Sequence, residues 1–342
     1  MSYAEFVGWG RYLPSLVVEN KDLERFVDTT DDWIKTRTGI KERRYSHVST
    51  AEMGWLAAER ALASADMLSS DLDLIILGST TANEVCPNTA SSIKNKLKAY
   101  SAAAIDLNSA CTSWLYGVSM ISDMIKVGSI ETGMVIGSER LSLGLDWNKR
   151  ESCCLFGDGA GAVILKKSRD KHGVIASRFS CVPDSREFLA IPKWGIQPAI
   201  HTNDLHLSMN FDGAAIFKRA VKSMSFDCEF VLDRAGLSIE DIDVFIPHQA
   251  NIRIINAVGS KLGIDPKKTV VTIDKYGNTS AASIPISLCE ALKNDMIRGG
   301  ETILIASFGA GLSCGAAVVK WGDTTKNIRN TAFSIPAYQG DV

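Results

Sequence analysis

Ser70-Asp-Leu-Asp-Leu-Ile-Ile-Leu77 recurs 170 residues later as Glu240-Asp-Ile-Asp-Val-Phe-Ile-Pro247, and this repeat decides the fold class. A second pair of matching segments has the same offset. Glu131-Thr132 and the apolar run that follows are echoed by Glu301-Thr302 and another apolar run. Two matches at one offset indicate two duplicated halves, and the period is too long for a solenoid.

Short apolar, β-branched runs alternate in each half with Ala-rich segments of helical period. The runs that predict strands are 72–77, 102–107, 133–137 and 161–165, then 242–246, 269–273, 302–306 and 315–320. The segments that predict helices include 51–65, 112–126, 214–235 and 280–297. This alternation is typical of an α/β fold in which helices cover sheets, with antiparallel strands still possible at the end of each half.

The duplication also divides the chain. We expect an N-terminal half over 1–168 and a C-terminal half over 213–321. The stretch 169–212 contains several prolines and no clean period, so we expect an irregular connection there. The polar residues 322–342 are expected to form a peripheral tail.

Composition limits the partners. The 342 residues are 46% hydrophobic, and 37 basic against 39 acidic side chains leave a net charge of -2. Nothing here favours nucleic acid or an anionic membrane as a partner. The first residues lack a basic stretch before a long apolar run, and no later segment resembles a membrane span, so we expect a soluble cytoplasmic protein. Eight cysteines without a C-x-x-C pair indicate reduced thiols and no metal site.

Cys111 is the first candidate for chemistry. It follows the apolar run 102–107 and precedes a helical pattern, which predicts a turn from strand to helix. Backbone amides and the helix dipole at such a turn favour a thiolate. Alone, the residue would more often be a small core hydrophobe.

His248 and Asn278 lie at similar places in the second half. Pro247-His248-Gln249-Ala250-Asn251 follows the run 242–246, and Tyr276-Gly277-Asn278-Thr279-Ser280 follows the run 269–273. A structural histidine and a helix-capping asparagine are the plain interpretations. However, duplicated halves bring equivalent strand ends into one cleft, and Asn278 then takes in the second half the place of Cys111 in the first. We therefore predict that these three residues form one site.

Two glycine-rich stretches have different interpretations. Phe308-Gly309-Ala310-Gly311-Leu312 predicts a tight turn whose amides approach a ligand, as an oxyanion site requires. Gly157-Asp158-Gly159-Ala160-Gly161 resembles a phosphate loop, but it precedes its strand. We interpret it as the turn that begins the strand and not as a nucleotide site.

The cysteine, histidine and asparagine, with the sequence motifs around them, resemble those of the thiolase superfamily and, within it, of β-ketoacyl-acyl-carrier-protein synthase III. The resemblance runs from about residue 5 to 321. The motifs that show the resemblance are Asp31 to Ile40, Phe156 to Ala162, Pro247 to Asn251 and Asn278 to Ser283. It implies a thiolase-like fold with two halves in α/β/α/β/α layers, a homodimer, and no cofactor other than a coenzyme A thioester as substrate.

The resemblance also implies a mechanism. Cys111 would attack an acyl-CoA and carry the acyl group, while the amides of Cys111 and Ala310 hold the oxyanion. His248 and Asn278 would hydrogen-bond the thioester oxygen of malonyl-acyl-carrier protein during decarboxylation. The carbanion would then attack the acyl-enzyme and give a 3-ketoacyl product, at the start of fatty acid biosynthesis.

Further positions follow from the same resemblance. Those that would bind the substrate are Trp33, Arg37, Arg150, Phe217, Asn251, Ile254 and Cys86. Those that would meet the acidic carrier protein are Lys218, Arg253 and Lys261. For Lys261 a solvated helix face remains the preferred interpretation.

The sequence departs from the family pattern at a few positions. Ala310 stands where glycine is usual, which constrains the turn, and Ala214 stands where an asparagine often contacts CoA. Cys86 stands where some members have a phenylalanine that reaches across the dimer and caps the acyl tunnel. The lost volume predicts a primer longer than acetyl, although the bulky Trp114 could offset the gain.

Two other functions stay open. A related acyltransferase or ketosynthase of secondary metabolism would use the same triad with another acceptor. A noncatalytic acyl-CoA binding subunit would be expected to lose the nucleophile, which is present. A 3-hydroxy-3-methylglutaryl-forming enzyme is disfavoured, because the motifs around Cys111 and Asn278 contain no acidic residue to serve as its additional base. The residues indicate neither an exact primer length nor the acceptor or the pathway.

Overall fold

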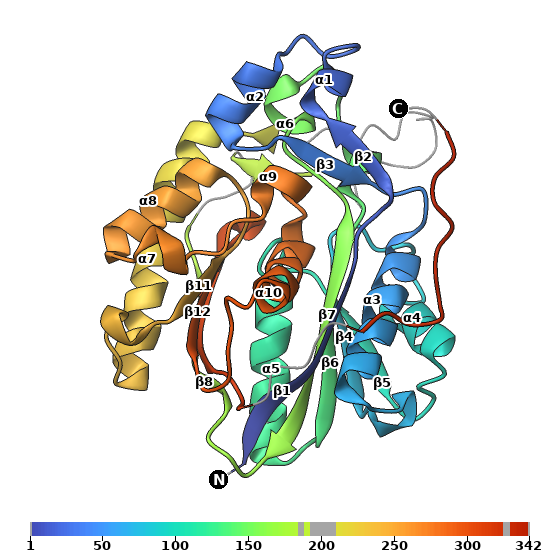
Figure 1. Ribbon diagram of the computed structural model, residues 1–342, viewed down its shortest axis with the longest axis vertical. Helices are drawn as coiled ribbons and strands as arrows, with labels where there is room; N and C mark the ends of the chain where they lie inside the picture. Colours follow the sequence, from blue (N-terminus) through green and yellow to red (C-terminus); the bar gives the residue numbers. More distant parts are fainter. Residues whose placement is uncertain (1, 184–187, 192–209, 324–328, 341–342) are drawn as a thin grey trace.

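The computed structural model describes residues 2–183, 188–191, 210–323 and 329–340, and its framework is two sheets (Figure 1). The first has the strand order β1-β7-β6-β4-β5 and the second the order β11-β12-β13-β8. The strands of the first sheet are β1 (Tyr3–Tyr12), β4 (Leu74–Gly78), β5 (Ala103–Leu107), β6 (Thr132–Glu139) and β7 (Gly159–Ser168). Those of the second are β8 (Gly173–Cys181), β11 (Val244–Pro247), β12 (Thr302–Phe308) and β13 (Ser313–Lys320).

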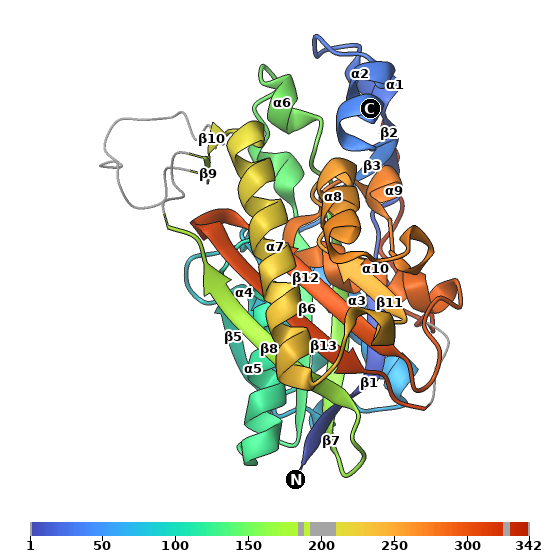
Figure 2. The same cartoon turned by 90° about the vertical axis from the view of Figure 1, so that its left-hand side faces the viewer.

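Helices cover both sheets and fill the space between them (Figures 1 and 2). On the outside of the first sheet lie α3 (Thr50–Ala65) and α4 (Thr89–Leu97); between the sheets lie α5 (Ser113–Val127) and α10 (Ser283–Lys293); outside the second lie α7 (Gly213–Ala235) and α8 (Ile252–Leu262). The α/β/α/β/α layering expected from the sequence is confirmed.

Smaller elements surround this framework. They are α1 (Asn20–Leu23), α2 (Asp31–Thr38), α6 (Arg150–Cys153), α9 (Ile273–Tyr276), the pair β2 (Leu16–Glu19) and β3 (Glu42–Tyr45), the pair β9 (Leu189–Ala190) and β10 (Asn210–Phe211), and the 3-10 turns η5 (Ser280–Ala282) and η6 (Ala310–Leu312).

The parallel strands of each sheet end at the same edge, where the candidate functional residues follow them. In the first sheet β4 runs parallel to β5 and β6, and in the second β11 runs parallel to β12. Parallel strands place their carboxyl ends on one edge, where ligands and catalytic groups collect. The last strand of each half, β7 or β13, runs antiparallel to its neighbour.

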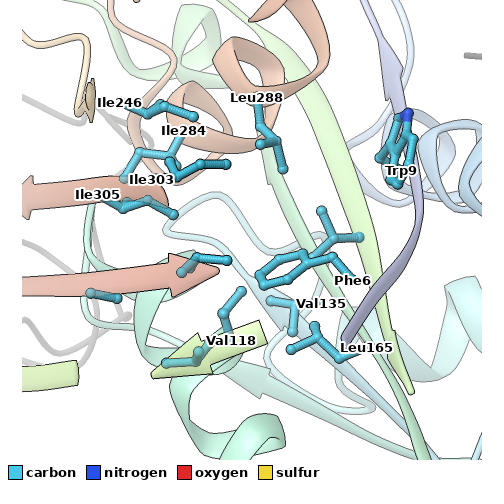
Figure 3. Close-up of a cluster of buried hydrophobic side chains, with 14 of the residues drawn as sticks. Phe6, Trp9, Val118, Val135, Leu165, Ile246, Ile284, Leu288, Ile303 and Ile305 are labelled. Atoms are coloured by element: carbon cyan, nitrogen blue, oxygen red, sulfur yellow. The ribbon is translucent and has the colours of Figure 1, made fainter. Parts of the chain in front are cut away.

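The largest apolar core lies between the sheets and draws on both halves (Figure 3). Phe6 and Val118 come from the first half, while Leu288 and Ile303 come from the second, and all four are buried. Because each half supplies one wall, neither half can bury this surface alone, and the packing of the two halves fixes the cleft between their strand ends.

Two sequence predictions are wrong in part. The expected irregular connection over 169–212 contains β8, an edge strand paired with β13. Ser177, Arg178 and Ser180 interrupt its apolar residues, so it gives no continuous apolar run in the sequence. The rest of that connection lies largely outside the described residues. The expected strand 269–273 is reduced to one bridge between Thr269 and Phe245, followed by α9. There the Gln249 side chain takes the amides of Thr272 and Ile273, which a strand would have used.

The turn 157–161 agrees with its prediction. β7 begins at Gly159, so the glycine-rich turn does begin a strand. Asp158 is buried and accepts hydrogen bonds from the amides of Ser46 and Ser142, and burial raises its pKa to about 6. Residues 329–340 contain no helix or strand and pack on α3, where Phe333 contacts Trp55.

Candidate active site

Cys111 lies in the loop from β5 to α5, two residues before the helix begins. Ala110 before it has a φ of 49°, a left-handed conformation that alanine rarely adopts, and it turns the chain so that the thiol faces the second half. Ser280 of the second half reaches the thiol, with its Oγ 3.4 Å from Cys111 Sγ. The halves therefore meet at the sulfur.

The protonation of this thiol differs from the sequence prediction. Burial raises the pKa of Cys111 to about 12, with a contribution from the nearby Glu139 carboxylate, and the hydrogen bond from Ser280 opposes the rise only in part. The expected preference for a thiolate at a helix N-terminus is outweighed by this desolvation. At neutral pH the resting group is a thiol.

His248 follows β11, and its orientation is fixed by a serine. Its amide donates to the Ala306 carbonyl, 2.8 Å away, and its Nδ1 lies 2.6 Å from Ser283 Oγ. Nε2 is therefore the ring nitrogen left for the cavity that His248 lines. Burial lowers the pKa of His248 to about 3, so the ring is neutral.

Asn278 is held by backbone bonds at the end of α9. Its amide donates to Leu155 and its carbonyl accepts from Gly157, at 2.8 and 3.1 Å. Its side-chain Oδ1 accepts from the amide of Ser280 at 2.8 Å. Because the oxygen is occupied, the Nδ2 group is the part of Asn278 that can donate to a ligand.

The turn at Ala310 has the geometry of an anion site. A Cβ on Gly309 would come within 2.8 Å of the Cys111 nitrogen, so only glycine permits this close approach. Among the described residues, the amides of Cys111 and Ala310 have no acceptor in another residue. The positive φ of the turn, 125°, falls on Gly311, so the alanine at 310 does not strain it.

These groups share one cavity of about 540 Å³ whose wall is mostly apolar. Cys111, His248, Asn278 and Ala310 all line it. Trp114 does not: it is fully buried in the core between the sheets. The sequence therefore correctly predicts that the three polar residues come together, while its expectation that Trp114 could narrow the tunnel is wrong.

Aromatic and basic side chains stand at the mouth of the cavity. The guanidinium carbons of Arg37 and Arg150 lie 5.1 and 4.9 Å from the ring centre of Trp33, which joins α2 to α6. An indole flanked by two guanidinium groups suits a flat base and anionic phosphates. Ala214 lines the same mouth.

The other predicted contacts divide into two groups. Phe217, Ile254, Lys218, Arg253 and Asn251 line the cavity. Both polar ends of the Asn251 side chain have internal partners, because it caps α8 through the Arg253 amide and donates to the Arg37 carbonyl. Lys261 lies away from the mouth, in a shallow depression between α7 and α8, and Cys86 is exposed and does not line the cavity of its own chain.

Three residues of the site were missed from sequence: Ser280 on the thiol, Ser283 on the histidine and the buried Glu139. The repeat offset of 170 could have found the two serines. It pairs Asn278 with Asn108, not with Cys111, and pairs Ser280 with Ala110, which also has a φ of 49°. The true counterpart of Cys111 is Ala281, so the predicted equivalence was three residues out.

Comparisons with known proteins agree with this geometry. The family model described as 3-oxoacyl-[acyl-carrier-protein (ACP)] synthase III matches residues 105–183, and its C-terminal counterpart matches 232–321. β-Ketoacyl-[acyl-carrier-protein] synthase III 2 of Vibrio vulnificus (strain YJ016) is 45% identical over 335 residues, 98% of this chain and 92% of that protein. The chain belongs to the β-ketoacyl-acyl-carrier-protein synthase III family.

Other members of the synthase III family extend the match to solved structures. The enzyme of Aquifex aeolicus (strain VF5) is 42% identical over 318 residues, covering 93% of this chain and 99% of its own. Its crystal structure superposes with a TM-score of 0.87 over 93% of this chain and 100% of that one. The priming β-ketosynthase of the R1128 polyketide pathway, 29% identical, superposes with a TM-score of 0.88 over 94% and 97%.

The described part of the chain contains neither a membrane-spanning helix nor a cluster of metal ligands. No helix there is both long and apolar enough to cross a membrane. No group of three or more histidine, cysteine or acidic side chains is arranged to hold a metal ion in the same residues.

Proposed function

We propose that this chain condenses the acyl group of an acyl-CoA primer with malonyl-acyl-carrier protein, giving a 3-ketoacyl-carrier protein at the start of fatty acid biosynthesis. The observation that carries the proposal is the convergence of one thiol, two side-chain donors and two unpaired amides on a single apolar cavity. Each of these groups matches a charge that develops during the reaction. The chain's own groups do the chemistry, with no cofactor other than coenzyme A itself.

The first half-reaction transfers the acyl group to the enzyme. Cys111 sulfur attacks the thioester carbonyl, and the amides of Cys111 and Ala310 stabilise the oxyanion. Collapse of this intermediate breaks the carbon–sulfur bond to coenzyme A, which leaves as a thiol. The stack of Trp33 with Arg37 and Arg150 supports binding of the adenine and phosphates at the mouth.

The second half-reaction makes the carbon–carbon bond. His248 Nε2 and Asn278 Nδ2 donate to the thioester oxygen of the malonyl group, so the enolate formed as CO₂ leaves is stabilised. A neutral histidine with a low pKa suits this task, because it donates a hydrogen bond and keeps its proton. The enolate carbon attacks the acyl carbonyl on Cys111 and releases the cysteine and the product.

Two cations support recognition of an acidic carrier protein. Lys218 and Arg253 are exposed and line the cavity mouth, and the Arg253 guanidinium lies 5.7 Å from the Phe217 ring centre. Lys261 lines a separate depression between α7 and α8, so we do not assign it this role. We expect long-range attraction of the carrier to weaken with salt.

A homodimer is part of the proposal. Among the described residues, strand β5 pairs only with β4, so no described strand covers its other edge, and Ile105 on it is 38% exposed. A free strand edge with apolar side chains needs a cover. In such a dimer the exposed loop with Val85 and Cys86 would be the part that reaches the partner, and Cys86 in place of a ring would leave room for a primer longer than acetyl.

A cytoplasmic location also belongs to the proposal. All eight cysteines are free, including the buried neighbours Cys153 and Cys154. A reducing compartment keeps such thiols, and the nucleophile among them, in the active state.

Product analysis tests the function. The purified enzyme is incubated with acyl-CoA primers of increasing length and malonyl-carrier protein, and the carrier is examined by intact mass. We expect 3-ketoacyl-carrier protein, with highest activity for a primer longer than acetyl. Preference for acetyl-CoA would contradict the tunnel argument; acylated enzyme that makes no product until an alcohol or amine acceptor is added would favour the acyltransferase alternative.

A further inference from the structure

His248 carries a single ring proton at neutral pH, because burial lowers its pKa to about 3. That proton lies either on Nδ1 or on Nε2, and the two tautomers differ in chemistry. With the proton on Nε2, the ring donates a hydrogen bond into the cavity that it lines. With the proton on Nδ1, Nε2 can only accept one. The choice of tautomer therefore decides whether His248 can act as a donor to a ligand.

Ser283 is the side chain that meets Nδ1. It is the first residue of α10, and its Oγ lies 2.6 Å from His248 Nδ1. Both side chains are buried, with 1% of Ser283 and 2% of His248 exposed. The backbone amide of Gln249 also donates to this oxygen, over a longer distance of 3.4 Å. Among the described residues, these two groups are the hydrogen-bond partners of the hydroxyl.

The donors and acceptors around this hydroxyl fix the direction of the short bond. The Gln249 amide can only donate, so it takes a lone pair of Ser283 Oγ. In the described part of the chain, the hydroxyl proton then has one acceptor, which is His248 Nδ1. A proton on Nδ1 would leave the hydroxyl proton buried without an acceptor, which is unfavourable. Donation from the serine to Nδ1 satisfies both groups and places the ring proton on Nε2.

The equivalent serine of the first half uses its hydroxyl differently. Ser113 lies 170 residues before Ser283, the offset of the repeat. Its hydroxyl donates to the Ala110 carbonyl at 2.6 Å and accepts from the Ser109 amide at 2.8 Å, so it stabilises its own turn. Within the described residues, Ser283 makes neither of the corresponding bonds and contacts the histidine instead. The hydroxyl of Ser283 therefore serves the histidine and not the turn.

We propose that Ser283 is a positioning residue, which donates its hydroxyl proton to Nδ1 and so holds His248 as the tautomer with the proton on Nε2. The inference rests on the proposed function, in which this N–H donates to the thioester oxygen of the malonyl group. A ring fixed in orientation and tautomer needs no rearrangement as negative charge develops on that oxygen. The proposed mechanism gives His248 no part in acylation of Cys111, so that step should not depend on Ser283.

The tautomer can be measured by nitrogen NMR of the intact enzyme labelled with ¹⁵N-histidine. A protonated and an unprotonated ring nitrogen have clearly different chemical shifts, and His248→Gln identifies the signals of His248 among those of the five histidines. At neutral pH we expect a protonated Nε2 and an unprotonated Nδ1 in the wild type. In Ser283→Ala the signals should move toward a mixture of the two tautomers. A protonated Nδ1 in the wild type would overturn the proposal.

The two half-reactions distinguish a positioning role from a structural one. In Ser283→Ala, kcat for decarboxylation of malonyl-carrier protein should fall by about 10- to 100-fold with KM changed by less than about threefold, because alignment matters most in the transition state. Acylation of Cys111 should stay within about twofold of the wild-type rate. Ser283→Thr keeps the hydroxyl and should restore the Nε2–H signal and most of kcat. Equal losses in both half-reactions of Ser283→Ala, or decarboxylation at the wild-type rate, would contradict the proposal.

Ser287, one turn further along α10, offers a matched control. It is buried as well, but its hydroxyl bonds to Thr272 Oγ1 at 2.8 Å. Ser287→Ala should leave the His248 signals unchanged and both half-reactions within about twofold of wild type. The same loss of decarboxylation in this variant would overturn the role of Ser283. Wild-type enzyme that showed the expected ring signals but made no 3-ketoacyl product would instead overturn the proposed function.

Discussion

The loops Asn108–Ser113 and Asn278–Ser283 have the same backbone and different chemistry. In each, the asparagine Oδ1 accepts from the amide two residues on, at 3.2 Å from Ala110 and 2.8 Å from Ser280. In each, that second residue has a φ of 49°. The residue after it is Cys111 in one loop and Ala281 in the other. The duplicated scaffold thus supplies two turns that share this φ and this hydrogen bond, and the side chain at the next position makes one of them the proposed nucleophile.

The strand ends beside these loops differ in the same way. Ser283 contacts His248, whereas Ser113 faces Gly78, where a Cβ would come within 2.9 Å of the serine Cβ. Glu139 at the end of β6 corresponds by the repeat to Gly309 after β12. One half therefore carries the thiol and a buried carboxylate, and the other carries His248 and Asn278. Under the proposed mechanism, the two halves therefore divide the catalytic roles between them instead of duplicating one function.

The largest effect should come from making the first loop like the second. Cys111→Ala reproduces Ala281 and removes the nucleophile, so we expect condensation to fall on the order of 10⁴-fold or more. Decarboxylation of malonyl-carrier protein should persist, since its donors lie in the other half. It is measured as CO₂ release. Loss of both steps together would argue against separate roles for the two halves.

The asparagines offer a matched pair. Asn278→Ala should lower decarboxylation by about 10²- to 10³-fold, because the enolate loses a donor, while the rate of Cys111 acylation stays close to wild type. Asn108→Ala removes the same turn hydrogen bond from an exposed site and should cost only about 1 kcal/mol of unfolding free energy. Urea unfolding and the two half-reactions are compared. Similar catalytic losses in both variants would show that the turn, not the donor, matters.

His248, which contacts the second loop through Ser283, should make the free energy of unfolding depend on pH. The pKa of His248 is about 3 in the folded chain against about 6.5 in the unfolded chain. Protonation of the unfolded chain therefore lowers the free energy of unfolding as the pH falls from 6.5 toward 3, and above pH 6.5 this loss is absent. At about pH 5 this loss is about 2 kcal/mol. His248→Gln should lack it. Urea unfolding of both proteins at about pH 7 and about pH 5 measures the difference, and parallel changes would contradict the buried neutral histidine.

The smallest effect is expected at Ala310. Because the positive φ falls on Gly311, Ala310→Gly relieves no strain and should change kcat by less than about threefold. Gly311→Ala is the matched comparison and should destabilise the turn. Steady-state kinetics of both variants would show whether the alanine limits the rate, and a large gain in Ala310→Gly would mean that it does.

The repeat predicted most of the strands, because apolar runs that recur at one offset are typical of equivalent buried strands in two duplicated halves. The prediction of a strand at 269–273 was wrong because the Gln249 side chain accepts backbone hydrogen bonds that a neighbouring strand would otherwise have accepted. β8 was not predicted because serine and arginine residues interrupt its apolar residues, so the strand gives no continuous apolar run. At the site, the thiol, histidine and asparagine were predicted from their places at strand ends. Glu139 was not, since a buried acid at the end of an apolar strand gives no signal until the fold brings it to Thr80, which lines the cavity.

The most direct test of the central claim follows the acyl group between the halves. Enzyme is acylated with acyl-CoA, the modified peptide is mapped, and malonyl-carrier protein is then added to the wild type and to Asn278→Ala. We predict an adduct on Cys111 in both proteins, rapid transfer to 3-ketoacyl-carrier protein in the wild type, and a persistent adduct in the variant. An adduct on another residue, or equal transfer in both proteins, would contradict the division of roles between the two halves.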